Sequence, residues 1–432
     1  MGRFTPYETA FVPERAILVG VDLGKSAWSL DDSLAELGRL AQTDGAEVVA
    51  TVTQRIAAPV PKTFIGSGKA DEIKQLVQSL DADVVIFDDE LTPSQQFNLE
   101  RIFGEPTKVI DRTALILDIF GRHATTSEGR LQVQLAQLQY VLPRLRGMWS
   151  HLVGEQTRGG IGSRFGQGES QLEVDRRLIR DRITSLRREL KALDARRAVQ
   201  SKARWDSGVY RVALCGYTNA GKSTLLNHLT ASDVYVQDEL FATLDATTRA
   251  LELDEGRKIT LTDTVGFIQK LPTTLVEAFK STLVEVANAD LTLLVVDASD
   301  PHAPLQIDAV NEVLDELGAR QIPQVVVYNK CDLLSADEKR DLALAHSDAV
   351  LVSALEGDGT QALLYRIARE ASLGDVTMTV LIPYSKGMLT KMVHERCQIM
   401  RRDYQETGVQ LTVKADARMA ATLRPYELAD ED

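Results

Sequence analysis

The sequence predicts an α/β multidomain protein in which two domains are built on parallel sheets. Three observations predict this class. Short apolar runs alternate with helical segments over residues 15–122, and the same alternation returns over 208–373. Between these regions, residues 125–204 carry leucine and isoleucine at helical spacing. We therefore expect an N-terminal parallel α/β domain (1–122), a long antiparallel helical hairpin (123–205), a second α/β domain (206–374) and a small α+β C-terminal domain (375–432).

The N-terminal domain is expected to alternate strand and helix throughout. Buried-strand runs occupy 16–22, 47–53, 84–89 and 107–111, and helical segments occupy 29–42, 69–80 and 94–103. The sequence "FIGSGK" at 64–69 looks like a phosphate loop, but it lacks the first glycine of that pattern and has no Ser or Thr after Lys69. We favour a tight turn before a helix that starts near Ala70, with a second nucleotide site as the open alternative.

Two amphipathic stripes predict the hairpin. Thr125 and Glu128 fit a capping box at the start of the first helix. The stripes consist of Leu131, Leu135, Leu138, Leu142 and Leu145, and of Ile179, Ile183, Leu186, Leu190 and Leu193. Their spacing of four and three residues is that of a packed helix pair. The stripes would pair within the chain and give a monomer; pairing between chains, as in a scaffold, is the alternative.

Charge is distributed unevenly over the chain. The formal net charge is -13, yet residues 141–205 hold 15 Lys and Arg against seven Asp and Glu. The glycine-rich run "QTRGGIGSRFGQGE" at 156–169 lies between the two stripes, at the expected tip of the hairpin. Such asymmetry indicates an element that binds a polyanion, although a solvated helix face is the simpler explanation.

Other bulk properties exclude several classes of protein. The three cysteines lie far apart and form no CxxC pair, which argues against a zinc site or a disulfide framework. The first residues show no signal pattern, and apolar runs such as 291–298 are too short to cross a bilayer. We expect a cytoplasmic protein without membrane insertion, with a peripheral position at a membrane left open.

The second α/β domain begins with a phosphate-binding motif. The strand "YRVALCG" is followed by "GYTNAGKST" at 216–224 and a helical segment, so G-x-x-x-x-G-K-S stands in strand–loop–helix context. Backbone amides of such a loop surround the β-phosphate, and Lys222 would reach β- and γ-phosphate oxygens. Ser223 would bind Mg²⁺, the expected cofactor.

Further motifs indicate GTP rather than ATP. "DTVGF" at 263–267 places Asp263 to hold Mg²⁺ through water and Gly266 to contact the γ-phosphate. Asp332 of "NKCD" would accept hydrogen bonds from the guanine N1 and exocyclic amine, and "SAL" at 353–355 would contact its O6. The expected GTP-binding residues are Gly216, Tyr217, Thr218, Asn219, Ala220, Gly221, Lys222, Ser223, Thr224, Phe241, Ala242, Thr243, Leu244, Asp245, Asp263, Thr264, Val265, Gly266, Asn329, Lys330, Asp332, Ser353, Ala354 and Leu355.

Two points about catalysis follow from the sequence. A switch-loop threonine should bind Mg²⁺, and spacing alone allows Thr243, Thr247 or Thr248. Ras-type enzymes orient the attacking water with a glutamine after D-x-x-G, but Phe267 stands there in this chain. We therefore expect slow unaided GTP hydrolysis that a partner stimulates; the alternative is that another switch-loop residue, such as Asp245, orients the water.

These motifs together resemble the HflX family of GTPases. The resemblance rests on residues 64–69, 127–145, 159–177, 216–224, "FATLD" at 241–245 and "DTVGF", and it covers most of the chain. It identifies the second α/β domain as a P-loop GTPase domain and points to Thr243 as the switch threonine. It implies a GTP-dependent partner, the large ribosomal subunit and its ribosomal RNA, and a role in splitting or rescuing ribosomes. It also implies ATP binding or weak ATPase activity in some members, which stays open here.

The resemblance gives the basic hairpin a target. Ribosomal RNA is a polyanion, and arginines and a glycine-rich backbone suit phosphate contacts. The expected RNA-binding residues are Arg158, Gly159, Gly160, Arg164, Phe165, Arg176 and Arg177. The alternative function is a GTP-regulated RNA-binding protein that acts away from the ribosome.

Overall fold

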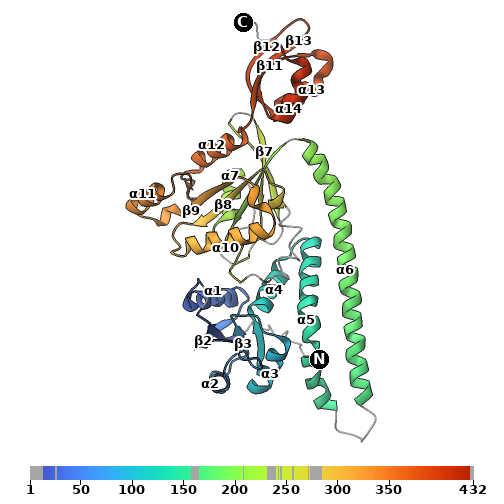
Figure 1. Ribbon diagram of the computed structural model, residues 1–432, viewed down its shortest axis with the longest axis vertical. Helices are drawn as coiled ribbons and strands as arrows, with labels where there is room; N and C mark the ends of the chain where they lie inside the picture. The colour runs from blue at the N-terminus through green and yellow to red at the C-terminus, as the bar shows by residue number, and fades with distance from the viewer. Residues whose placement is uncertain are drawn as a thin grey trace, which may run out of the picture. The chain divides into compact units, whose positions relative to one another are not determined.

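The protein was analysed as a computed structural model, which describes residues 13–24, 27–156, 165–207, 209–230, 240–241, 243, 246–254, 257–270, 272 and 285–428. The chain divides into two compact units. One comprises Met1–Leu190 with Lys270–Ala278, and the other Lys191–Gln269 with Phe279–Asp432. Figure 1 labels the elements of both. No helix among the described residues is long and apolar enough to span a membrane.

A four-stranded parallel sheet forms the centre of the N-terminal unit, as predicted. Its order is β2-β1-β3-β4. The strands are β1 (Arg15–Asp22), β2 (Glu47–Arg55), β3 (Val84–Phe87) and β4 (Lys108–Asp111), and the helices are α1 (Leu30–Thr43), α2 (Ser67–Leu80), α3 (Pro93–Phe103) and α4 (Arg112–His123). Polar side chains cap three of these four helices: Ser29 caps α1, Thr92 and Gln95 form a capping box on α3, and Asp111 caps α4.

The start of α2 differs from the prediction. The helix begins at Ser67, three residues before the expected start near Ala70. Phe64 takes a left-handed backbone conformation with φ +65°, and the Gly66 amide donates to the side chain of Gln54 at 3.0 Å. The turn therefore ends at Gly66, and Ser67, Gly68 and Lys69 belong to the helix instead of the turn.

The two stripes of the hairpin pair within the chain. They lie on α5 (Ser127–Gln156) and α6 (Phe165–Ser207). Leu135, Ile183 and Leu186 form a buried cluster, which is flanked by Leu131, Leu138, Leu142, Ile179 and Leu190. The helices run side by side in Figure 1. The stripes therefore pair with each other inside one chain, and the expectation of a monomer stays a prediction.

Two details of the hairpin were predicted incorrectly. The first helix is capped by Thr126, whose hydroxyl accepts a hydrogen bond from the Gly129 amide at 2.9 Å, and not by Thr125. The second helix begins at Phe165, so the final part of the glycine-rich run is helical instead of belonging to the loop. Residues 157–164 lie outside the described part of the chain.

The second α/β domain contains a six-stranded sheet in the order β10-β9-β8-β5-β7-β6. All pairs are parallel except β6 with β7. The strands are β5 (Tyr210–Gly216), β6 (Thr247–Glu252), β7 (Lys258–Asp263), β8 (Leu291–Asp297), β9 (Gln324–Asn329) and β10 (Val350–Leu351). The helices are α7 (Lys222–Thr230), α10 (Ala303–Glu316), η1 (Ala319–Gln321), η2 (Cys331–Leu333), α11 (Ala336–Ala345) and α12 (Thr360–Ala371). Because β5, β7, β8 and β9 are parallel, their carboxyl ends share one edge of the sheet.

The C-terminal domain is an antiparallel sheet in the order β11-β13-β12. It contains β11 (Val376–Pro383), η3 (Tyr384–Lys386), α13 (Gly387–Arg396), β12 (Gln398–Tyr404), β13 (Gly408–Ala415), α14 (Ala417–Leu423) and η4 (Arg424–Tyr426). The strand β12 has a weak strand pattern of its own, because it lies at an edge and four of its seven residues are Arg, Asp or Gln. Pairing with β13, rather than its own pattern, makes it a strand.

Candidate functional site

The phosphate-binding loop lies between β5 and α7, at the shared edge of the sheet. Gly216 ends β5 and Lys222 begins α7, so amides of the loop and of the helix N-terminus point to one place. Asn219, within the loop, takes a left-handed conformation with φ +59°. The motif therefore stands in the strand–loop–helix geometry that phosphate binding requires.

Two glycines in the loop have no room for a side chain. A Cβ at Gly216, where φ is +149°, would lie 2.1 Å from the carbonyl oxygen of Val295. A Cβ at Gly221, where φ is +86°, would lie 2.2 Å from the Asn329 Nδ2. Both backbone conformation and space thus restrict these positions to glycine.

Lys222 is held inside the loop. Its ammonium donates to the carbonyl oxygens of Gly216 at 3.1 Å and Tyr217 at 2.8 Å. Burial lowers the pKa of Lys222, although the nearby Asp263 carboxylate acts in the opposite direction. A desolvated cation held by two carbonyls is well placed to exchange them for phosphate oxygens.

Three oxygen-bearing side chains converge beside Lys222. The Ser223 hydroxyl donates to the Asp263 Oδ2 at 2.5 Å and lies 2.9 Å from the Thr243 hydroxyl. Thr248 bonds instead to Thr262 across the β6–β7 pair, at 2.9 Å. Of these two threonines, the structure therefore brings Thr243 to the site.

The oxygen cluster fits a hard divalent cation. Asp263 is fully buried, and its Oδ1 has no hydrogen-bond partner among the described residues. Burial raises the pKa of this carboxyl, although Lys222 and the bond from Ser223 act against it. An unpartnered carboxylate oxygen beside two hydroxyls is a ligand set of the kind that Mg²⁺ prefers, directly or through water.

The "DTVGF" segment is bonded to the phosphate loop by its backbone. The Phe267 amide donates to the Gly216 carbonyl at 3.1 Å, and the Thr218 amide donates to the Phe267 carbonyl at 2.8 Å. A Cβ at Gly266 would lie 3.2 Å from the Lys222 Nζ, so this glycine packs directly on the loop. The Phe267 side chain is buried and has no group that could orient water.

Asn329 connects the phosphate loop to the expected guanine site. Its Nδ2 donates to the Ala220 carbonyl at 2.8 Å, and its Oδ1 accepts from the Ala354 amide at 2.9 Å. The Ser353 hydroxyl donates to the Asp332 Oδ1 at 2.6 Å. The "NKCD" and "SAL" segments are therefore neighbours in space, whereas the Leu355 side chain is exposed.

Asp297 is a further residue of this region and was not predicted from the sequence. Asp297 ends β8, and its Oδ2 lies 2.7 Å from the Lys330 Nζ. Lys330 takes a left-handed conformation with φ +61°, and the ion pair fixes its side chain. The sequence did contain a signal for this residue, since an aspartate directly follows the largely apolar run 291–296. The carboxyl ends of parallel strands gather at one edge of a sheet, so a polar residue at that position is expected near the site.

The chain is similar to known proteins along most of its length. Three family models match: "GTP-binding GTPase N-terminal" over residues 31–121, "GTP-binding GTPase Middle Region" over 123–204 and "50S ribosome-binding GTPase" over 211–330. GTPase HflX of Caldanaerobacter subterraneus is 44% identical over 97% of this chain and 95% of its own length. The chain belongs to the HflX family of GTPases.

Other HflX proteins and one solved structure are also similar. GTPase HflX of Escherichia coli is 42% identical and covers 91% of this chain and 92% of its own length. A crystal structure titled "crystal structure of SsGBP and GDP complex" is 25% identical, with a TM-score of 0.46 over 82% of this chain and 98% of that one. As an HflX family member, the protein is a GTPase.

Several predicted residues of this HflX protein fall outside the described chain. Ala242, Leu244, Asp245, Arg158, Gly159, Gly160 and Arg164 are among them. Phe165 begins α6, but its side chain is also outside the description. Arg176 is half-buried and Arg177 exposed on α6. Farther along the helix, Arg182 donates to Gln134 of α5 at 2.8 Å, so it contributes to pairing of the helices.

The second candidate phosphate loop of the HflX chain has its lysine occupied. The Lys69 Nζ lies 2.7 Å from Glu72 of the same helix. This exposed-carboxylate pair is local and contributes little to stability. Its geometry adds no support for a nucleotide site at 64–69.

Substitution of Gly221 tests the close approach at the nucleotide site. We expect Gly221→Ala to displace Asn329 and lower GTP affinity at least about tenfold, because the new Cβ meets the Asn329 amide. Gly318→Ala is the matched control: φ is +70° there too, but nothing lies within 4 Å. The control should destabilise the protein by about 1 kcal/mol and leave GTP binding intact. Equal affinity losses in the two variants, measured by fluorescent-nucleotide titration, would contradict this assignment.

Proposed function

We propose that this GTPase binds the large ribosomal subunit when GTP is bound, that the ribosome stimulates hydrolysis, and that the outcome is splitting or rescue of ribosomes. The similarity of residues 211–330 to the "50S ribosome-binding GTPase" family carries the proposal. Whole-length identity above 40% to GTPase HflX proteins supports it.

Each group of site residues has a proposed role. Lys222 binds β- and γ-phosphate oxygens, and Asp332 selects guanine by accepting two hydrogen bonds. Ser223 and Thr243 hold Mg²⁺, with Asp263 acting through water. The cation, when bound, neutralises charge on the phosphate oxygens. The unpartnered Asp263 oxygen supports this assignment.

Dependence on a partner follows from Phe267. A buried phenyl ring supplies no hydrogen bond to an attacking water. The isolated protein therefore lacks the group that Ras-type enzymes use at this position, and we propose that the ribosome completes the site. Release follows when GDP relaxes the switch segments around Thr243 and Gly266.

The hairpin is the proposed RNA-binding element. The region 141–205 carries a net charge of +8 on a chain whose total is -13. We propose that Arg176, Arg177 and the glycine-rich run contact ribosomal RNA phosphates, whose binding weakens with salt.

Turnover with ribosomal particles tests the function. We expect purified large subunits to raise the rate of GTP hydrolysis at least about tenfold, because they complete a site that lacks a water-orienting group. Small subunits at the same concentration serve as the control. If large subunits leave turnover unchanged while free RNA competes equally for binding, the protein acts away from the ribosome.

Removal of two hairpin charges tests the RNA contact. We expect the double variant Arg176→Gln/Arg177→Gln to bind large subunits more weakly and to lower the slope of log affinity against log salt by about 1 to 2. Arg401→Gln/Arg402→Gln removes the same charge from exposed positions of β12. Affinity is measured by co-sedimentation. If the slope of log affinity against log salt is unchanged in the hairpin variant, Arg176 and Arg177 do not contact the RNA phosphates.

A further inference from the structure

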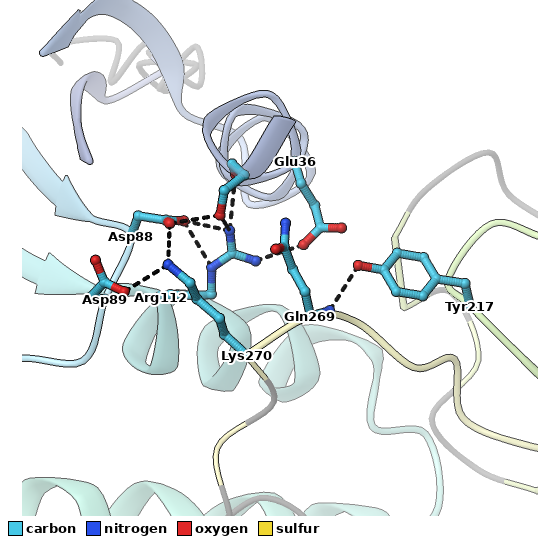
Figure 2. A network of polar contacts seen from close by, with 8 residues as sticks. Glu36, Asp88, Asp89, Arg112, Tyr217, Gln269 and Lys270 are labelled. Carbon is cyan, nitrogen blue, oxygen red and sulfur yellow. Dashed lines mark hydrogen bonds and ion pairs between the residues drawn. The ribbon is translucent and has the colours of Figure 1, made fainter. Parts of the chain in front are cut away.

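A buried charged cluster lies in the N-terminal unit and contains none of the residues of the nucleotide site. Arg112, at the start of α4, is 2% exposed. Its guanidinium contacts Glu36 at 2.7 Å and Asp88 at 2.5 Å, and it donates to the Ser33 carbonyl at 3.0 Å. Figure 2 shows these groups converging from different elements.

The cluster carries more negative than positive charge without a further cation. Asp88 and Glu36 are both buried, and Arg112 supplies a single positive charge. Lys270 supplies the second: its Nζ lies 2.5 Å from Asp88 and 2.7 Å from the partly exposed Asp89. Burial by itself would raise the pKa of Asp88, but Arg112 and Lys270 outweigh it and lower that pKa. An uncompensated buried carboxylate is costly, so the cluster favours a docked Lys270.

The backbone at Lys270 also indicates a constrained position. Its φ is +53°, a left-handed conformation that lysine rarely adopts. Such a conformation persists when surrounding contacts hold it. The Lys270 side chain is held by its two ion pairs, because the Asp88 carboxylate is itself fixed by Arg112 and by the Ser33 hydroxyl.

Lys270 closely follows the nucleotide-sensing segment. It is three residues after Phe267. The backbone amide of the intervening Gln269 donates a hydrogen bond to the Tyr217 hydroxyl at 2.8 Å. Tyr217 belongs to the phosphate loop, and its strand-like bridge pairs it with Phe267. Figure 2 shows Tyr217, Gln269 and Lys270 along this stretch. Lys270 groups with the N-terminal unit, whereas Gln269 groups with the GTPase unit.

We propose that Lys270 is an anchor that couples the nucleotide state of the GTPase domain to the N-terminal domain through Asp88 and Asp89. In this structure Thr243 lies beside Ser223, and Gly266 packs on Lys222. Thr243 and Gly266 therefore both lie beside the groups expected to bind Mg²⁺ and the γ-phosphate, which is where a γ-phosphate favours them. Docking of Lys270 therefore accompanies the GTP-type arrangement and stabilises it. Coupling of this kind is reciprocal, so GTP also favours the docked anchor.

The coupling goes beyond the proposed ribosomal function and is a property of the free protein. The coupling can therefore be tested without ribosomes. A negative result would contradict the role of Lys270 and would not bear on the proposed ribosomal function. Asp88 is unsuitable for substitution, because its loss would take from the buried Arg112 one of its two carboxylate partners and disturb the cluster itself. Lys270 and the partly exposed Asp89 are the informative positions.

A double-mutant cycle measures the coupling. The variants are Lys270→Met, Asp89→Asn and the combination, and Lys258→Met is the control at an exposed position of β7. Binding of fluorescent GDP and of a fluorescent non-hydrolysable GTP analogue is titrated in Mg²⁺ with the full chain. We expect Lys270→Met to weaken the GTP analogue about fivefold or more while GDP affinity changes less than about twofold. Asp89→Asn should give a smaller change in the same direction.

The combined variant distinguishes an anchor from independent effects. It should bind the analogue no more weakly than Lys270→Met, because the partner of Asp89 is already lost. The proposal would be overturned if the variants bound GDP and the GTP analogue equally more weakly. It would also be overturned if the fold-losses in analogue affinity of the two single variants multiplied in the combined variant. Lys270→Arg should retain the nucleotide preference of the natural chain, and GDP binding reports directly that each variant is folded.

Discussion

The nucleotide site depends on one buried carboxylate. Asp263 ends β7 and lies next to Leu214 of β5 in the sheet register, so the parallel pairing sets its position. One oxygen is bonded to Ser223, and the other has no partner among the described residues. A buried acceptor left unpaired costs about 1–3 kcal/mol. A cation that binds there offsets this cost. The unpaired oxygen therefore destabilises the free protein and favours the cation-bound form.

Backbone contacts keep the rest of the site close to that carboxylate. The hydrogen bonds of Phe267 with Gly216 and Thr218 hold "DTVGF" against the phosphate loop. Asn329 performs the equivalent role at the other side by bonding Ala220 and Ala354. Movement of either segment therefore reaches the phosphate loop directly. In the free protein, the Lys270 anchor would extend this connection into the N-terminal domain.

Local patterns were sufficient to predict most of the architecture. The apolar runs gave both parallel sheets, the leucine spacing gave the hairpin, and the glycine–lysine motif placed the phosphate loop, because each signal is contained within a few neighbouring residues. Convergence of Thr243 with Ser223 was expected only from family resemblance, since spacing allowed three threonines. The structure now brings Thr243 into contact and leaves Thr248 in the sheet.

Long-range pairing accounts for what the sequence did not reveal. The edge strand β12 depends on β13. The partners Arg112 and Asp88 are 24 residues apart, and Lys270 is 182 residues from Asp88, so no local motif links them. The start of α2 at Ser67 and the cap of α5 at Thr126 differ from the predictions by three residues and by one residue. No side-chain cap marks the start of α2, and two adjacent threonines precede α5.

The cation dependence of GTP binding tests the central role of Asp263 most directly. Affinity for a non-hydrolysable GTP analogue would be measured with Mg²⁺ and with excess chelator, in the natural chain and in Asp263→Asn. We expect Mg²⁺ to strengthen binding at least about tenfold in the natural chain and to have little effect in the variant. An Asp263→Asn protein that retains the full Mg²⁺ dependence would contradict the assignment.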